Sequence, residues 1–208
     1  MTTPLTRGIL YVVSAPSGAG KTSLVRALCD SNERIRVSIS FTTRQPRPGE
    51  ENGRDYHFVD AREFRRRIDA GDFIEHACVF DQYYGTSRVA VMEQLQRGLD
   101  VILEIDWQGA QQVRRSMPEC VSIFILPPSP ETLEQRLRSR NQDSDEQILR
   151  RLGEAKEEMS HYREYDYLIV NDDFSTALQE LQTVIRGGHL RCATQRDRYR
   201  DLLARLLA

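Results

Sequence analysis

The sequence predicts an α/β fold in which a parallel β-sheet is covered by helices on both faces. Short apolar runs rich in Val, Ile and Leu occupy 8–14, 100–106 and 121–128, as expected of strands buried in a parallel sheet. Segments with helical spacing separate these runs, and an alternation of strands and helices is typical of parallel sheets. Polar, arginine-bearing stretches at 38–96 and 129–160 interrupt the alternation, and we interpret both as insertions into the core.

Local patterns define the elements of the first half of the chain. The first strand ends in a glycine-rich turn, and TSLVRALC follows the turn with helical spacing. Asp60, with Glu63 three residues later, is a helix-start pattern, because each side chain can bond the backbone amide of the other. The expected elements are a helix over 22–29, strands over 36–40, 73–80 and 82–87, and helices over 60–71 and 87–98.

The second half continues in the same way. Ser129 followed by Pro130 begins a helix, because proline lacks the N–H that a first helical turn leaves unbonded. SDEQ at 144–147 is a second helix-start pattern. The expected elements are strands over 100–106, 121–128 and 165–172, helices over 131–140 and 144–159, and terminal helices over 175–186 and about 192–207.

The composition fits one globular domain with a local, not a global, positive field. The 208 residues are 39% hydrophobic and 29% charged, which is enough apolar material to build a core. The net charge of -2 argues against nucleic acid or an anionic membrane as a partner. No apolar run approaches the roughly 18 residues of a spanning helix, and the first residues lack an apolar signal segment. The four cysteines are widely spaced, so we expect reduced thiols in a cytoplasmic protein and no Cys or His metal site.

The last predicted helix leaves two interpretations open. It is rich in arginine and also carries Leu202, Leu203, Leu206 and Leu207. In one interpretation this helix contacts another subunit, and the chain forms a homo-oligomer. In the other, which we favour, the arginines face solvent and the leucines pack inward.

Residues 15–22, APSGAGKT, match the phosphate-loop pattern G-x-x-x-x-G-K-[ST] except at Ala15. Glycines in such a loop let successive backbone N–H groups converge on an anion beside a helix N-terminus. The lysine reaches the β- and γ-phosphates, and the following hydroxyl is offered to Mg²⁺. A tight turn is the alternative, but the strand and helix on either side are the context that the motif requires. We therefore expect a P-loop NTPase-like core with ATP contacts from Ala15, Pro16, Ser17, Gly18, Ala19, Gly20, Lys21 and Thr22, and with Mg²⁺ at Thr22.

A second motif, D-x-x-G, spans Asp106 to Gly109 at the end of a buried strand. A GTPase interpretation would also need a downstream N-K-x-D, which the sequence lacks. Asp106 could instead serve a metal-bound water or orient an arginine, and the plainest alternative is a cap at the end of the strand.

Eight segments together resemble bacterial guanylate kinases: SAPSGAGKT, TTRQPRPGE, DYHF, FIEH, YYGTS, EIDWQGAQQ, ILPPS and YLIVNDD, in this order. The similarity runs from about 8 to 186. It implies transfer of the γ-phosphoryl group of ATP to GMP, and also to dGMP, in purine nucleotide metabolism, with Mg²⁺ as cofactor. It further implies a core formed by 1–37, 97–128 and 161–208, a mobile GMP-binding region at 38–96 and a mobile lid at 129–160.

The resemblance also implies roles for individual side chains. Family members hold the GMP phosphate with the positions of Arg44, Arg47, Tyr56 and Tyr84, and they read guanine with those of Ser40, Glu75 and Thr86. Asp106 is implied to lie among the GMP contacts. A guanidinium fork matches a phosphate, and one carboxylate is complementary to the adjacent N1–H and N2–H₂ donors of guanine, a pair that adenine lacks.

The lid and the end of the last core strand supply the remaining implied residues. Arg136, Arg140 and Arg151 resemble lid arginines that cover the polyphosphate, whereas Arg138 and Arg150 fit a solvated helix face with Glu partners. Lys21, Arg44, Arg136 and Arg151 form the implied catalytic set. Asn171 fits the adenine end of ATP.

Plainer alternatives accompany these assignments. Glu75 could be a solvated carboxylate on a strand, and the implied serine and threonine could be ordinary turn hydroxyls. Tyr56 and Tyr84 could be core aromatics, although Tyr83 is the better core candidate of its adjacent pair. The rival functions are another nucleoside monophosphate or sugar-phosphate kinase and a non-catalytic guanylate-kinase-like binding module.

Ala15, Glu104 and the run RSRN at 138–141 depart from the usual pattern of the family. None of these departures touches Lys21 or Glu75.

Overall fold

Two β-sheets organise the chain, and the structure, a computed structural model, describes residues 7–79, 81–139 and 145–208. The larger sheet is parallel, with five strands in the order β2-β7-β1-β8-β9. Its strands are β1 (Leu10–Ser14), β2 (Ile35–Val37), β7 (Asp100–Glu104), β8 (Val121–Leu126) and β9 (Tyr167–Val170). The parallel sheet confirms the predicted α/β class.

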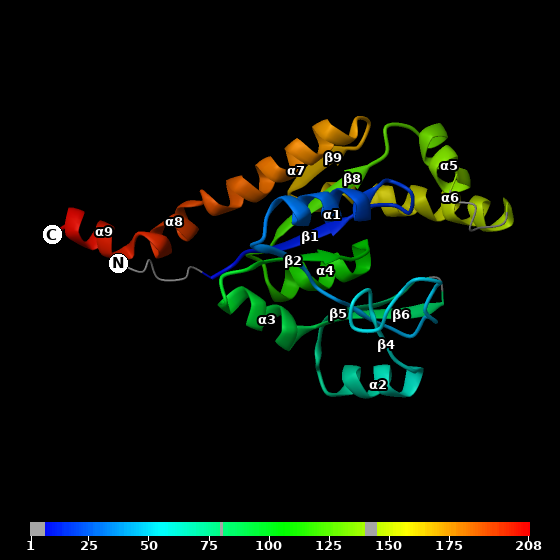
Figure 1. Cartoon of the computed structure of the whole chain (residues 1–208), viewed down its shortest axis with the longest axis horizontal. Coiled ribbons are helices and arrows are strands. Elements are labelled where there is room, and N and C mark those ends of the chain that lie inside the picture. The colour runs from blue at the N-terminus through cyan, green and yellow to red at the C-terminus, as the bar shows by residue number, and fades with distance from the viewer. Residues whose placement is uncertain (1–6, 80, 140–144) are drawn as a thin grey trace.

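Helices cover both faces of the larger sheet (Figure 1). α1 (Lys21–Ser31) and α7 (Phe174–His189) pack on one face, and α3 (Arg88–Gln96) and α4 (Trp107–Ser116) pack on the other. Strand β1 shows why two cores form, because its side chains alternate between the faces. Tyr11 and Val13 join the α1 and α7 side, whereas Leu10 and Val12 join the α3 and α4 side.

The smaller sheet lies beyond the α3 and α4 face, beside α2 (Figure 1). Its strand order is β4-β3-β6-β5. The elements are β3 (Phe41–Thr42), β4 (His57–Phe58), α2 (Ala61–Asp69), β5 (Phe73–Val79) and β6 (Gln82–Ser87). Asp60 begins α2 as expected, since its side chain accepts a hydrogen bond of 2.7 Å from the backbone N–H of Glu63. Gly71, with a φ of 69°, follows the end of this helix.

Two helices form an arm at the carboxyl ends of the strands. α5 (Pro130–Ser139) and α6 (Asp145–Ser160) share a small core of their own and lead into a 3-10 turn at His161–Glu164. Ser129 caps α5 through a hydrogen bond of 3.1 Å from the N–H of Thr132 to its hydroxyl. The helix-start pattern expected at 144–147 involves Ser144, which lies outside the described residues.

Three expectations need correction. No helix was expected over 107–116, yet α4 is there; its buried face is only Gly109, Ala110 and Val113, too short a stripe to stand out among glutamines and arginines. The strand expected over 36–40 is β2 and ends at Val37. Tyr83 is 40% exposed, not a core residue.

The end of the chain also differs from the favoured interpretation. The expected helix over 192–207 is two helices, α8 (Cys192–Arg198) and α9 (Arg200–Leu206), which extend away from the body (Figure 1). Neither has a buried residue, and Leu206 and Leu207 are largely exposed. The inward packing of the leucines is therefore wrong for Leu202, Leu206 and Leu207, which are exposed because α9 extends away from the body; Leu203 is half-buried. Among the described helices, none is long and apolar enough to cross a membrane.

Candidate functional site

A cavity of about 280 Å³ opens where the P-loop, the smaller sheet and α6 meet. The P-loop contributes Ala15, Pro16, Ser17, Gly18, Gly20, Lys21 and Thr22. The other predicted residues that line it are Ser40, Arg47, Tyr56, Glu75, Tyr84, Asp106 and Arg151. The fold thus brings together, in one cavity, side chains that are as far apart in sequence as Ala15 and Arg151.

The P-loop wraps as its glycines require. Gly18 and Gly20 have φ values of 96° and 93°, in the left-handed region that favours glycine. Among the described non-glycine residues, Asp81 alone has a positive φ, so Ala15 replaces the usual first glycine without backbone strain. Ala19 points into the core and is fully buried, so its side chain does not face the cavity.

Asn171 supports the P-loop from behind. It is 4% exposed, and its side-chain amide donates a hydrogen bond of 2.7 Å to the carbonyl of Ala19. A Cβ at Gly20 would lie only 2.3 Å from the same amide nitrogen, so the two residues are in close contact. In this arrangement Asn171 fixes the P-loop, and its contact with adenine stays a prediction.

The residues that could hold a metal lie at the start of α1 and the end of β7. The hydroxyl of Thr22 donates a hydrogen bond of 3.0 Å to Oε2 of Glu104. Hydroxyl and carboxylate oxygens are the donors that Mg²⁺ prefers, so this pair fits the ion.

Asp106 begins α4. Its Oδ1 accepts a hydrogen bond of 2.9 Å from the N–H of Gly109, and its other oxygen accepts one from Gln108. Burial raises the pKa of Asp106, although these hydrogen bonds and the nearby charge of Lys21 oppose the rise. Asp106 is therefore a cap at the end of the strand, which was the plainest alternative for this residue, and its carboxylate also lines the cavity.

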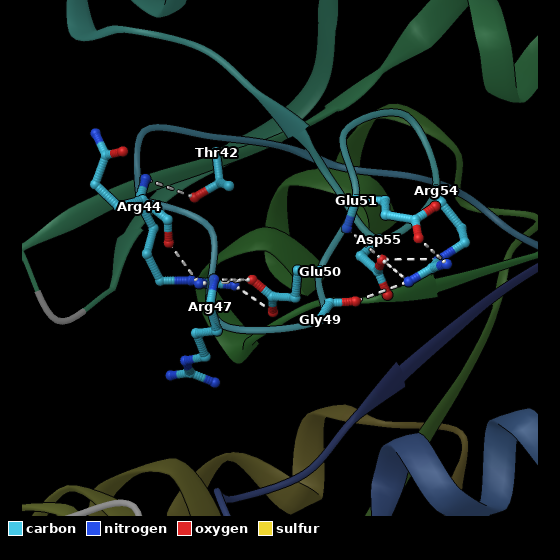
Figure 2. A network of polar contacts seen from close by, with 9 residues as sticks. Thr42, Arg44, Arg47, Gly49, Glu50, Glu51, Arg54 and Asp55 are labelled. Carbon is cyan, nitrogen blue, oxygen red and sulfur yellow. Dashed lines mark hydrogen bonds and ion pairs between the residues drawn. The ribbon is translucent and has the colours of Figure 1, made fainter.

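Arg44 and Arg47 lie on one turn but point differently (Figure 2). The Arg44 guanidinium forms a two-pronged pair with Glu50, with N–O distances of 2.9 and 2.8 Å. Oε2 of Glu50 also accepts a hydrogen bond of 2.7 Å from the backbone N–H of Arg47. Figure 2 shows the Arg47 guanidinium reaching away from this carboxylate, and it lines the cavity, whereas Arg44 does not.

Glu75 is the most enclosed carboxylate of the cavity. It is 3% exposed, and its Oε1 accepts a hydrogen bond of 2.5 Å from the hydroxyl of Thr86. Burial is the largest cause that raises the pKa of Glu75 to about 7, and the negative charge of Asp106 adds to it. Thr86 is fully buried behind Glu75, and Ser40 lies 3.4 Å from it, hydroxyl to hydroxyl. The alternative of a solvated strand carboxylate is therefore wrong.

Two tyrosines close the cavity on the side of Arg44. The Tyr56 and Tyr84 rings meet edge to face with centroids 6.0 Å apart, and both line the cavity. The Arg44 guanidinium lies 5.3 Å from the centre of the Tyr56 ring. Burial raises the pKa of the Tyr56 phenol, so it stays a neutral hydrogen-bond donor. Neither tyrosine is a plain core aromatic.

The arm of α5 and α6 brings arginines to the P-loop. Nη1 of Arg151 donates a hydrogen bond of 3.2 Å to the Ser17 hydroxyl. Nη2 of Arg136 donates one of 3.1 Å to the carbonyl of Asn171, and its Nη1 is buried without a partner among the described residues. A buried donor without a partner is costly, so this nitrogen favours an anion beside it. Arg140 lies outside the described residues.

The two arginines expected on a solvated face are found there. Arg138 pairs with Glu134 and Arg150 pairs with Glu154, each across one helical turn on an exposed surface. This interpretation is confirmed for both.

Sequence reasoning missed Glu50, Glu158 and Gln112. Glu158 lines the cavity from α6, seven residues after Arg151 and so on the same face of that helix. Burial raises the pKa of Glu158 to about 7, while Lys21 and the backbone N–H of Ser17 oppose the rise. The spacing from Arg151 was the available signal for Glu158. Gln112 contacts His76, 36 residues away in the sequence, so only the fold brings the two together. Glu50 pairs with Arg44 and Arg47 on its own turn, so its proximity to these arginines was the available signal.

Known proteins resemble this chain over nearly its whole length. The sequence matches the family model described as guanylate kinase over residues 7–187. A guanylate kinase of Methylococcus capsulatus is 58% identical over 203 residues, which cover 98% of this chain and all of that protein. The guanylate kinase of Escherichia coli K12 is 56% identical over 206 residues, again with 98% of this chain covered and all of that protein. A crystal structure of guanylate kinase from Anaplasma phagocytophilum is similar with a TM-score of 0.75 at 37% identity, covering 90% of this chain and 89% of that one. This chain therefore belongs to the guanylate kinase family.

Proposed function

We propose that this chain transfers the γ-phosphoryl group of ATP to GMP and releases ADP and GDP. One observation supports this most: a single cavity joins an anion-binding P-loop to a buried carboxylate with a hydroxyl beside it. The P-loop suits a polyphosphate donor. Glu75, as a carboxylate, is complementary to the two adjacent N–H donors on the edge of guanine, and adenine would leave it unsatisfied.

The reaction needs positioning and charge more than covalent chemistry. Arg47 and the two tyrosines hold the acceptor phosphate, and Arg44 joins them on the same turn. Lys21, Arg136 and Arg151 neutralise charge on the transferring group. When bound, Mg²⁺ supplies further neutralisation of phosphate charge, with Thr22 as its protein ligand and Glu104 orienting that hydroxyl.

The two insertions are proposed to close over the substrates. The smaller sheet within 38–96 carries the acceptor side chains, and the arm within 129–160 carries Arg136 and Arg151. Closure excludes water, whose attack would hydrolyse ATP without product. The proposed contacts read the base and the phosphate of the acceptor, not its sugar, so we extend the proposal to dGMP.

A coupled assay of ADP release tests the proposal. ATP is supplied with GMP, dGMP, AMP, UMP or TMP, and Lys21→Ala is the inactive control. We expect fast ADP release with GMP and dGMP and little with the other three. Equal rates with AMP or UMP would assign a different monophosphate kinase, and no GMP-dependent release would leave a binding module.

We further propose that the protein is cytoplasmic and forms a homo-oligomer. All four cysteines are free, as in a reducing compartment. The exposed leucines of α9 support contact with another subunit, the first of the two interpretations of this helix. Light scattering on the purified protein gives the mass in solution, and a monomer at micromolar concentration would contradict the oligomer.

A further inference from the structure

Strand β5 carries Glu75 and has a free edge. It stands last in the order β4-β3-β6-β5, so within the described sheet β6 is its strand partner on one side. Backbone groups on the other side of an edge strand need partners of another kind. Here α4 faces that edge, in close contact with β5.

The side-chain amide of Gln112 pairs with this free edge. Its Oε1 accepts a hydrogen bond of 3.1 Å from the N–H of His76, and its Nε2 donates one of 2.7 Å to the carbonyl of His76. One carboxamide thus satisfies both backbone groups of a residue, as a neighbouring strand would. His76 directly follows Glu75, so the clamp fixes the backbone beside the carboxylate.

Gly109 leaves the space that the Glu75 carboxylate fills. It lies three residues before Gln112, on the same face of α4. A Cβ at Gly109 would lie 2.5 Å from Oε2 of Glu75 and 3.2 Å from its Cδ. Helix α4 therefore approaches β5 so closely that any side chain at 109 would displace the carboxylate.

We propose that Gln112 and Gly109 are positioning residues for guanine recognition, Gln112 by clamping the backbone of β5 and Gly109 by leaving the slot for Glu75. This inference rests on the proposed function, in which Glu75 reads guanine. A recognition group must be held to within a fraction of an ångström, and a displacement of about 1 Å can cost about a hundredfold. Since α4 begins at Asp106, the clamp also links the guanine-reading strand to the core that carries the P-loop.

Replacing Gln112 by Met tests the clamp, because Met keeps the length of the side chain and removes both hydrogen bonds. Gln111→Met is the matched control. Gln111 is the adjacent glutamine of α4, and its amide bonds Glu164, away from β5. The measurements are kcat and KM for GMP, KM for ATP, the rate with AMP, and the midpoint of urea unfolding.

We expect Gln112→Met to lower kcat/KM for GMP by about tenfold to a hundredfold, mainly through KM. The KM for ATP should change less than about twofold, and the ratio of GMP to AMP activity should fall. The acid limb of kcat/KM for GMP should also move to lower pH, because a loosened strand admits water to Glu75. Gln111→Met should match the wild type in all of these.

Gly109→Ala provides a second, independent variant. It should reproduce the loss of GMP discrimination while keeping the KM for ATP, since its added methyl meets Glu75. The proposal is overturned if Gln112→Met behaves like Gln111→Met, or if it raises the KM for ATP as much as that for GMP. A wild type without GMP-dependent ADP release would instead overturn the proposed function, so the two failures are distinguishable.

Discussion

In the function proposed above, the donor and acceptor halves of the cavity both hold phosphate, and they do so in different ways. The donor half is a loop of backbone amides that follows β1, a strand with neighbours on both sides in the parallel sheet. The acceptor half is a set of side chains on β5 and β6 and on a turn closed by ion pairs. Backbone amides remain after most substitutions, so the donor half depends on its glycines and on Lys21. The acceptor half depends on each side chain and on what holds that side chain in place.

The largest expected effect on kcat/KM comes from removing one cation from each half, Lys21 from the donor half and Arg44 from the acceptor half. Lys21→Ala and Arg44→Ala should each lower kcat/KM by about a hundredfold to a thousandfold, because each removes a preorganised charge from a transferring or receiving phosphate. Lys21→Ala should lower kcat/KM whether ATP or GMP is the limiting substrate, whereas Arg44→Ala should lower mainly the kcat/KM for GMP. The urea midpoint should stay close to that of the wild type for both. Near-normal turnover in either variant would contradict the division of the cavity into these two halves.

The next effect isolates recognition of the base. Glu75→Gln keeps the shape but replaces an acceptor with a donor, so kcat/KM for GMP should fall about a hundredfold while the KM for ATP is kept. Stability should not fall, because the substitution removes a buried ionisable group. Steady-state kinetics with each substrate varied, together with urea unfolding, measures both. An unchanged kcat/KM for GMP would remove Glu75 from base recognition.

The two halves should also respond to pH in opposite directions. Glu75 and Glu158 both have a pKa raised to about 7, mainly by burial. In the proposed function GMP binds Glu75 as a carboxylate, so the affinity for GMP should fall by up to about tenfold per pH unit below pH 7. ATP brings negative charge to the P-loop beside Glu158, so protonation of Glu158 should improve its affinity over the same range.

Matched variants separate these titrations from those of the substrate phosphates. Glu158→Gln should flatten the pH dependence of the affinity for ATP and leave that for GMP unchanged. Glu75→Gln should flatten the pH dependence of the affinity for GMP and leave that for ATP unchanged. The folded state holds the Glu75 proton more tightly than the unfolded chain, so its contribution to stability is present below about pH 4.5 and is lost as the pH rises through about 7. If one variant flattened the pH dependence of both affinities, the assignment of Glu158 to ATP and of Glu75 to GMP would be contradicted.

The donor half was predictable from the sequence, and the acceptor half only in part. The residues of the P-loop are contiguous in the sequence, so the motif spacing, together with the strand before it and the helix after it, predicts the loop. Glu75 and Tyr84 come together with Tyr56 only through the smaller sheet, so the family resemblance was needed to name them. Helix α4 was missed because its buried stripe is short and because Asp106 to Gly109 matched a nucleotide-binding motif. The contacts of Gln112 and Asn171 join segments distant in sequence, and no local pattern encodes such pairs.

The smallest expected effect tests whether the acceptor turn depends on its ion pair. Glu50→Gln should raise the KM for GMP by about threefold to tenfold, because it weakens the two-pronged contact that orients Arg44. Salt-bridging keeps the pKa of Glu50 low, so the carboxylate orients Arg44 throughout the neutral range.

Glu51→Gln is the neighbouring control. Its partner Arg54 is more than half exposed, and a solvated pair of this kind contributes little. We expect Glu51→Gln to leave the KM for GMP within about twofold. Equal effects of the two substitutions would show that the turn is held by its backbone, as the P-loop is, and the contrast between the halves would then reduce to the guanine-reading strand.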